Sequence, residues 1–305
     1  MARPRIWRAL QFFVGALLVG LAIRSIAVNW QSLRSQPIEW QFSTGWIVAS
    51  VLTVFASYAV LIEAWRRVVL SMGETLAFLT AARIWFLASL GKYIPGKVWA
   101  VAGAAVLAQR AGVDPAVAVA GALVLQVLAL ASGAAVVAVT AGDTFQAVGQ
   151  GAIPIAAAVI ILSLVGVAGL TSQPFLDRIG RLLPAAWPRP RAIPAGMVVA
   201  AFVANVLAWI GYGVALLLLA RGLLPNVVLG LPQATGVFTC SYLVGFLALF
   251  APGGLGPRES VFLLMLAGDI GLKPAAALAL ASRLLLTGTE VLPAVPFLLR
   301  RGLSG

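Results

Sequence analysis

The sequence predicts an all-α polytopic membrane protein, and three observations lead to this prediction. Hydrophobic residues make up 62% of the 305 residues and charged residues only 10%, whereas soluble domains carry about 25% charged residues. Four long runs, 44–62, 115–142, 192–220 and 222–257, contain no charged side chain. The third observation is a pair of apolar stretches that proline and glycine interrupt in the middle.

Six full spans follow from apolar runs that are long enough to cross about 30 Å of hydrocarbon. A basic stretch, "RPRIWR", precedes the first of them. A cleaved signal peptide is the alternative there, but no small-residue cleavage pattern follows, so we expect a retained span. The six expected spans are 9–28, 44–64, 116–140, 151–171, 196–220 and 275–299.

The two interrupted stretches, 75–110 and 234–269, predict re-entrant helical hairpins. The first breaks at "IPGK" and the second at "FAPGGLGPRE". Their arms of about 13–17 residues are shorter than the about 20 residues that a full span needs. Pairs of full spans are the alternative, and they would leave the orientation of every other span unchanged.

The distribution of positive charge predicts the orientation, because cytoplasmic loops collect lysine and arginine. With the N-terminus in the cytoplasm, twelve arginines fall inside and only four basic residues fall outside. The C-terminus is then cytoplasmic as well. The longest stretch outside the membrane, about 172–195, is too short for a soluble domain, so residues 1–305 are expected to form a single integral membrane domain.

An internal repeat is visible around the two interruptions. "GKYIPGKVW" at 91–99 aligns with "ALFAPGGLG" at 248–256, and a Gly-x-x-Pro turn with an alanine-rich span follows each. Chance similarity between alanine- and leucine-rich segments is the alternative. The charge bias makes the first hairpin enter from the cytoplasm and the second from outside, so the repeats, approximately 75–140 and 234–299, are expected to be inverted. Transporters with inverted repeats bind their substrate near the midplane, between broken helices.

The broken tips of the hairpins carry the candidate binding residues. Non-helical backbone at membrane depth is tolerated only where protein or water surrounds it. The helix that begins after each break presents unpaired N–H groups and the positive end of its dipole, which favours an anion. Lys97 stands at the start of one such helix and Arg258 at the start of the other. A lipid phosphate is the candidate anion, because the planar fork of arginine binds phosphate oxygens in pairs.

The candidate residues fall into two groups. The expected substrate-binding residues are Lys92, Tyr93, Lys97, Trp99, Arg258, Glu259, Arg283, Glu290 and Arg83. The expected structural residues of the tips are Pro95, Gly96, Pro252, Gly253, Gly254 and Gly256.

Two of these charges, Arg283 and Glu290, lie inside the last span, seven residues apart and on one helical face. A charge at the bilayer centre costs about 2.5–3.5 kcal/mol on insertion scales, so each is expected to have a partner or a role. One interpretation is an ion pair with each other or with the tip that holds Arg258 and Glu259. The other makes Arg283 a second phosphate ligand and Glu290 a binder of cationic head groups or protons. Two simpler roles are open for Glu259: it could neutralise Arg258, or it could stabilise a helix N-terminus.

The remaining candidate charges belong to the first hairpin. Lys92 and Lys97 would reach an interface by snorkelling if this hairpin is shallow. Arg83 lies in the entering arm, where we expect it to guard a cytoplasmic mouth.

Taken together, these motifs resemble one family. "GKYIPGKVW", followed much later by "PGGLGPRE" and a last span with an internal arginine and glutamate, is similar to the flippase-like membrane region of lysylphosphatidylglycerol synthases, over about residues 10 to 300. The resemblance implies a membrane domain that moves aminoacylated phosphatidylglycerol between leaflets. No stretch of the 305 residues resembles the soluble aminoacyl-transferase of those synthases, so lysyl transfer is not implied. Stand-alone members are associated with other lipids, including polyprenyl-phosphate sugars and hopanoid-related lipids, so the substrate does not carry over.

The favoured function is a lipid flippase or scramblase for an anionic or phosphate-bearing lipid. No ATP-binding motif is present, so movement would be passive or coupled to an ion. An anion or solute channel or exchanger and a non-transporting accessory subunit of a lipid-modifying enzyme are the alternatives. A membrane transferase is disfavoured, because no two of the nine acidic residues are adjacent or one apart and the chain has no histidine. We therefore expect no catalytic residues, no metal and no cofactor.

The expected partners are membrane lipids, with a separate lipid-synthesising enzyme or a second copy of the chain as further alternatives. The net charge of +12 does not favour nucleic acid, because the basic residues are scattered between apolar runs. The expected location is the bacterial cytoplasmic membrane.

Overall fold

The computed structural model describes residues 40–93, 98–140, 161, 165–166, 168–169, 171–182, 192–248 and 251–299, and all the regular elements within them are helices. Four helices are long and apolar enough to cross a membrane. They are α3 (Thr44–Ser71), α6 (Pro115–Thr140), α10 (Ala195–Leu223) and α13 (Leu272–Leu299).

These four helices coincide with four of the six expected spans. Expected span 9–28 lies outside the described residues, and so does most of 151–171. The all-helical membrane class is therefore confirmed, while the number of spans and the orientation of the termini stay predictions. A short helix, α9 (Gln173–Leu182), occupies the proline- and arginine-rich stretch between the two halves of the chain.

Local sequence explains where the long helices begin. Pro115 is the first residue of α6, a position where its missing N–H costs nothing, and the Asp114 carboxylate accepts a hydrogen bond of 2.8 Å from the Ala116 N–H. This is the ordinary action of an aspartate at a helix N-cap. Polar side chains also join the spans to one another: the Ser50 hydroxyl of α3 donates to the Ala215 carbonyl of α10 over 2.7 Å.

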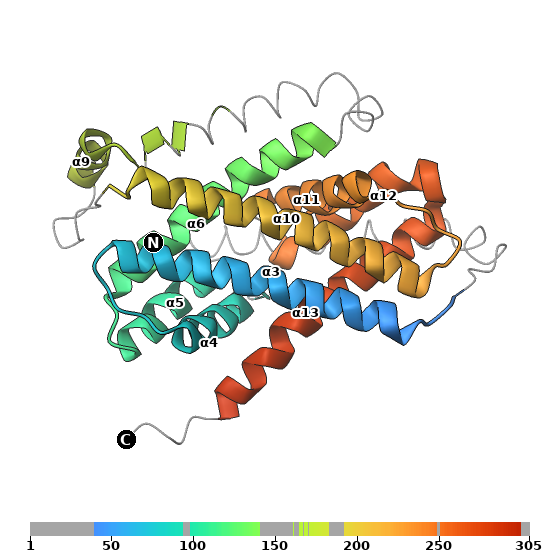
Figure 1. The fold of residues 1–305 in the computed structure, drawn as a ribbon, viewed down its shortest axis with the longest axis horizontal. Coiled ribbons are helices and arrows are strands. Elements are labelled where there is room, and N and C mark those ends of the chain that lie inside the picture. Colours follow the sequence, from blue (N-terminus) through green and yellow to red (C-terminus); the bar gives the residue numbers. More distant parts are fainter. Residues whose placement is uncertain are drawn as a thin grey trace, which may run out of the picture.

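Helix α10 packs against α3, α6 and α11 (Leu231–Leu247), and it lies beside α3 along most of its length (Figure 1). Glycines make this close packing possible. A Cβ added at Gly211 would lie 2.3 Å from the Ser57 Oγ, and one at Gly213 would lie 2.6 Å from the Cα of Thr235. Small residues at the contact let helix backbones approach closely, which is how helices associate where lipid removes the hydrophobic driving force.

Both interrupted stretches form a short helix, a 3-10 turn and a second short helix. The first consists of α4 (Phe78–Ser89), η1 (Leu90–Tyr93) and α5 (Val98–Arg110), and the second of α11, η2 (Pro252–Gly254) and α12 (Pro257–Ile270). At 1.5 Å per residue, α4, α5 and α12 are about 18–21 Å long, which is less than the about 30 Å of a hydrocarbon core. A long helix, α6 or α13, follows each unit. Helix α11, with 17 residues, is longer at about 25 Å, and the re-entrant and inverted geometry stays a prediction.

The two broken segments meet in space although about 160 residues separate them. Turn η1 contacts η2, and α13 packs against both α4 and α12. Figure 1 shows α13 running past the end of α4 on its way from the α11–α12 pair. The last long helix is therefore the element against which both breaks are placed.

Candidate functional site

The second broken segment turns through glycines in the left-handed region of backbone conformation. Gly253, Gly254 and Gly256 have φ angles of 56°, 72° and 90°, which residues with a Cβ rarely adopt. Gly254 also lies directly against α11: a Cβ added there would be 2.9 Å from the Cα of Gly245 and 3.0 Å from its carbonyl oxygen. The run "PGGLG" therefore folds the chain back onto α11 and sets where α12 begins.

Replacing Gly254 by alanine is expected to destabilise the protein. The left-handed conformation costs a residue with a Cβ about 1–2 kcal/mol, and the clash with the backbone of Gly245 adds to this cost. Gly268, inside α12, has open space around it, so Gly268→Ala is the matched control and is expected to be neutral or to stabilise by up to about 1 kcal/mol. Thermal unfolding in detergent measures both. A Gly254→Ala midpoint at or above that of Gly268→Ala would contradict the close approach.

The start of α12 is held by the side chain of Glu259. Its Oε2 accepts a hydrogen bond of 2.8 Å from the Gly256 N–H, and its Oε1 forms an ion pair with the Nη1 of Arg283 on α13. The Nη2 of Arg283 donates to the Gly253 carbonyl over 3.2 Å. Arg283 therefore binds both the turn and the helix that follows it, and it ties the second break to α13.

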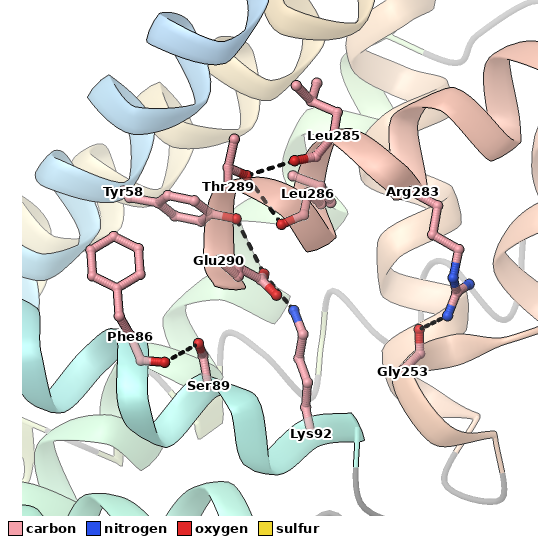
Figure 2. A network of polar contacts seen from close by, with 10 residues as sticks. All are labelled: Tyr58, Phe86, Ser89, Lys92, Gly253, Arg283, Leu285, Leu286, Thr289 and Glu290. Carbon is pink, nitrogen blue, oxygen red and sulfur yellow. Dashed lines mark hydrogen bonds and ion pairs between the residues drawn. The ribbon is translucent and has the colours of Figure 1, made fainter. Parts of the chain in front are cut away.

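The first broken segment is tied to the same helix by a second ion pair. The Lys92 Nζ of η1 lies 2.5 Å from the Oε1 of Glu290 on α13, and the Tyr58 hydroxyl of α3 donates to the same oxygen over 3.1 Å. Figure 2 shows Tyr58 and Lys92 approaching the carboxylate from different elements. The side chain of Glu290 is 8% exposed and that of Lys92 31% exposed.

Arg283 and Glu290 thus pair with opposite charges from two different broken segments. The interpretation that they pair with each other is not what the structure shows. The interpretation that a charge of the last span pairs with the second tip is borne out for Arg283. For Glu259, the N-terminal role is observed at Gly256, and its ion-pair partner is Arg283 rather than the adjacent Arg258. Two helical turns of α13 consequently connect both breaks.

Arg258 has a different environment from the other two cations. It is only 7% exposed, and its Cζ lies 5.2 Å from the ring centroid of Phe238 and 5.9 Å from that of Tyr242. Its Nη2 makes a long contact of 3.4 Å to the Ser282 Oγ. Its Nε is buried and has no hydrogen-bond partner within the described part of the chain.

The other sequence candidates are placed as follows. Arg83 on α4 and Trp99 at the start of α5 carry exposed side chains, whereas Arg258 and Glu290 at the two breaks are buried. The described residues include Tyr93 in η1 and Pro252 in η2 by their backbone only. Pro95, Gly96 and Lys97 lie outside the described residues. The binding roles assigned to these residues stay predictions.

Sequence reasoning did not select Tyr58, Phe238, Tyr242 or Ser282. Tyr58 lies in α3, Ser282 in α13, and Phe238 and Tyr242 in α11. No unusual local pattern marks them, so only their tertiary contacts single them out. The available signal was weak. A buried tyrosine hydroxyl usually finds a hydrogen-bond partner. Tyr58 lies in the run 44–62, which contains no charged side chain, so a charged partner had to come from outside that run.

The arrangement gathers cations from both breaks beside α13. Glutamates neutralise Lys92 and Arg283, while the Arg258 Nε–H has no acceptor among the described residues. Models of known protein families give no match to the chain, and no curated protein is significantly similar to it. The family resemblance therefore stays an expectation from the motifs.

Proposed function

We propose that the protein is a lipid flippase or scramblase that moves an anionic or phosphate-bearing lipid between leaflets. One observation carries the proposal: two broken helical segments contact each other in an apolar bundle, and charges from both converge on one helix, α13. Buried charge in a membrane bundle is costly and usually marks a substrate or ion pathway. Broken helices supply N-terminal ends and cations for such a substrate.

The glutamates give the proposal a physical mechanism. In the observed state Glu290 neutralises Lys92 and Glu259 neutralises Arg283. A lipid phosphate that reaches this centre can take the place of a carboxylate on Lys92 or Arg283, so that no cation is left without an anion at membrane depth. The phosphate would pass between the breaks while the acyl or prenyl tails stay in the surrounding lipid. Movement is passive or ion-coupled in this scheme.

Lipid translocation by the purified protein in liposomes tests this function. The vesicles would contain phosphatidylglycerol labelled on an acyl chain, and a membrane-impermeant quencher would report the fraction that reaches the outer leaflet. We expect protein-dependent movement that Lys92→Gln reduces strongly. Arg67→Gln is the matched control, because Arg67 carries a 60% exposed side chain in a surface ion pair with Glu63.

The possible outcomes separate the alternatives. Absence of lipid movement with any head group would contradict the flippase and favour an accessory role. Flux of small anions without lipid movement would favour a channel. Equal rates in wild type and Lys92→Gln would contradict the assignment of the first break, even with translocation present. Lys97→Ala, measured in the same assay, tests the candidate that only the sequence supports.

A further inference from the structure

We infer that this site selects lipids whose head group carries one net negative charge on a phosphodiester, and that Arg258 is the cation which this charge neutralises. The inference rests on the proposed function and names its substrate class. Phosphatidylglycerol and a prenyl lipid joined to a sugar through one phosphate share this chemistry.

The charges of the described residues at the two breaks support a single negative charge. Three cations, Lys92, Arg258 and Arg283, face two carboxylates, Glu259 and Glu290. Each carboxylate forms an ion pair with one cation, Glu290 with Lys92 and Glu259 with Arg283. Among the described residues one positive charge is left over, and it belongs to Arg258.

Arg258 is placed as a ligand-binding group rather than as a satisfied structural cation. A guanidinium stays protonated in proteins, and a buried charge without a counter-ion is costly. The faces of Phe238 and Tyr242 offset part of that cost through cation–π attraction. An aromatic face is at best a weak acceptor for an N–H, and the buried Nε has no oxygen or nitrogen acceptor in the described part of the chain.

The start of α12 adds further donors beside this guanidinium. Arg258 and Glu259 lie in the first turn of the helix, where backbone N–H groups have no partner within the helix. The positive end of the helix dipole acts in the same direction. A phosphate oxygen that accepts the Nε–H would therefore also lie near a helix N-terminus, which is a favoured position for an anion.

The charge balance also defines which head groups bind less well. A phosphodiester carries one negative charge, and it would balance the charges of the described residues at the two breaks. A phosphate monoester carries about −1.5 to −2 at pH 7, with a second pKa near 6, so it would leave an excess negative charge beside Glu259 and Glu290. A zwitterionic head group would bring an additional cation into a centre that already has an excess of positive charge.

Binding of short-chain lipids to the full chain in detergent tests this selectivity without requiring transport. The probes are dioctanoyl phosphatidylglycerol, dioctanoyl phosphatidic acid at pH 8 and dioctanoyl phosphatidylcholine, with a short prenyl-phosphoryl-glucose as a fourth arm. The rise in the thermal unfolding midpoint with lipid concentration measures the affinity. We expect the two monoanionic phosphodiesters to bind more tightly than the other two by roughly tenfold to a hundredfold, the range for hydrogen bonds to a charged group. If only one of the two monoanionic lipids binds tightly, that result shows whether the site takes a glycerophospholipid or a prenyl lipid.

Three variants test whether Arg258 and the charge balance cause the preference. Arg258→Gln should bind the anionic and zwitterionic lipids alike, and Arg258→Lys should keep most of the preference because it keeps the charge. Glu290→Gln adds one net positive charge and should shift the preference toward the dianionic phosphatidic acid. Glu63→Gln changes a charge that pairs with Arg66 and Arg67 and is the control, with no shift expected.

The outcomes distinguish this inference from the proposed function. Equal binding of all four lipids by the wild type would overturn the charge rule, and so would an unchanged preference in both Arg258→Gln and Glu290→Gln. If Arg258→Gln does not fold, the shift in Glu290→Gln decides the matter. Selective binding without translocation in liposomes would leave the charge rule standing and overturn only the flippase.

Discussion

Reversing the charge of either Lys92 or Glu290 alone is expected to destabilise the protein strongly. Reversing both charges together should restore most of the lost stability. Lys92→Glu places two carboxylates side by side, and Glu290→Lys places two ammonium groups together at a position that is 8% exposed. Removing one partner of a buried ion pair costs about 3–5 kcal/mol. The 31% exposure of Lys92 places this pair toward the lower end of that range.

Thermal unfolding in detergent and translocation in liposomes measure this effect. The double variant Lys92→Glu/Glu290→Lys recovers the ion pair, but the Tyr58 O–H loses its acceptor, because an ammonium group can only donate to the Tyr58 oxygen. We therefore expect partial rather than full recovery. Arg67→Ala at the exposed pair with Glu63 is the control, because surface pairs are worth about 0–1 kcal/mol. A double variant as unstable as the sum of its single variants would rule out direct pairing between η1 and α13.

Replacing Arg283 by glutamine is expected to detach the second broken segment from α13. Arg283 pairs with Glu259 and donates to the Gly253 carbonyl, so its loss leaves a carboxylate without its counter-ion and a turn without its anchor. We expect at least about a tenfold loss of translocation, the scale set by hydrogen bonds to a charged group. Hydrogen exchange of the backbone over residues 251–256 should also become faster.

Two further variants separate the charge of Arg283 from its shape. Arg283→Lys keeps the charge but lacks the planar fork that reaches two acceptors at once, so it should recover stability more than translocation. Arg283→Gln with Glu259→Gln removes both charges and should fold better than Arg283→Gln alone, because no unpaired carboxylate is buried. Unchanged hydrogen exchange at 251–256 in Arg283→Gln would show that α13 does not anchor the turn.

The sequence predicted the helical elements well because their signals are local. Uncharged runs identify spans through the cost of exposing charge to lipid, and the four long described helices start or end close to the expected limits. The interruptions at "IPGK" and "FAPGGLGPRE" were equally visible, since proline and glycine disrupt helices through their own backbone chemistry. Candidate charges were visible too, because any ionisable residue inside an apolar run is unusual.

Pairing between these charges was much less predictable. The sequence left open whether Arg283 and Glu290 pair with each other or with the second tip, and each has its partner on a different segment. Helical periodicity shows which residues share a face, but not which distant segment packs against that face. Tyr58, Phe238 and Tyr242 were missed for the same reason, because their role depends only on what lies beside them.

The sequence by itself determined the solvent, the helical class, the two breaks and the few charges at membrane depth, because each depends on the residues of one short stretch. Only the tertiary structure decided that both breaks meet beside α13, that glutamates neutralise Lys92 and Arg283, and that Arg258 has no such partner among the described residues. The physical reason is that an ion pair depends on distances of a few ångströms between segments that are about 200 residues apart in the chain, as Lys92 and Glu290 are. Packing of the whole bundle sets those distances.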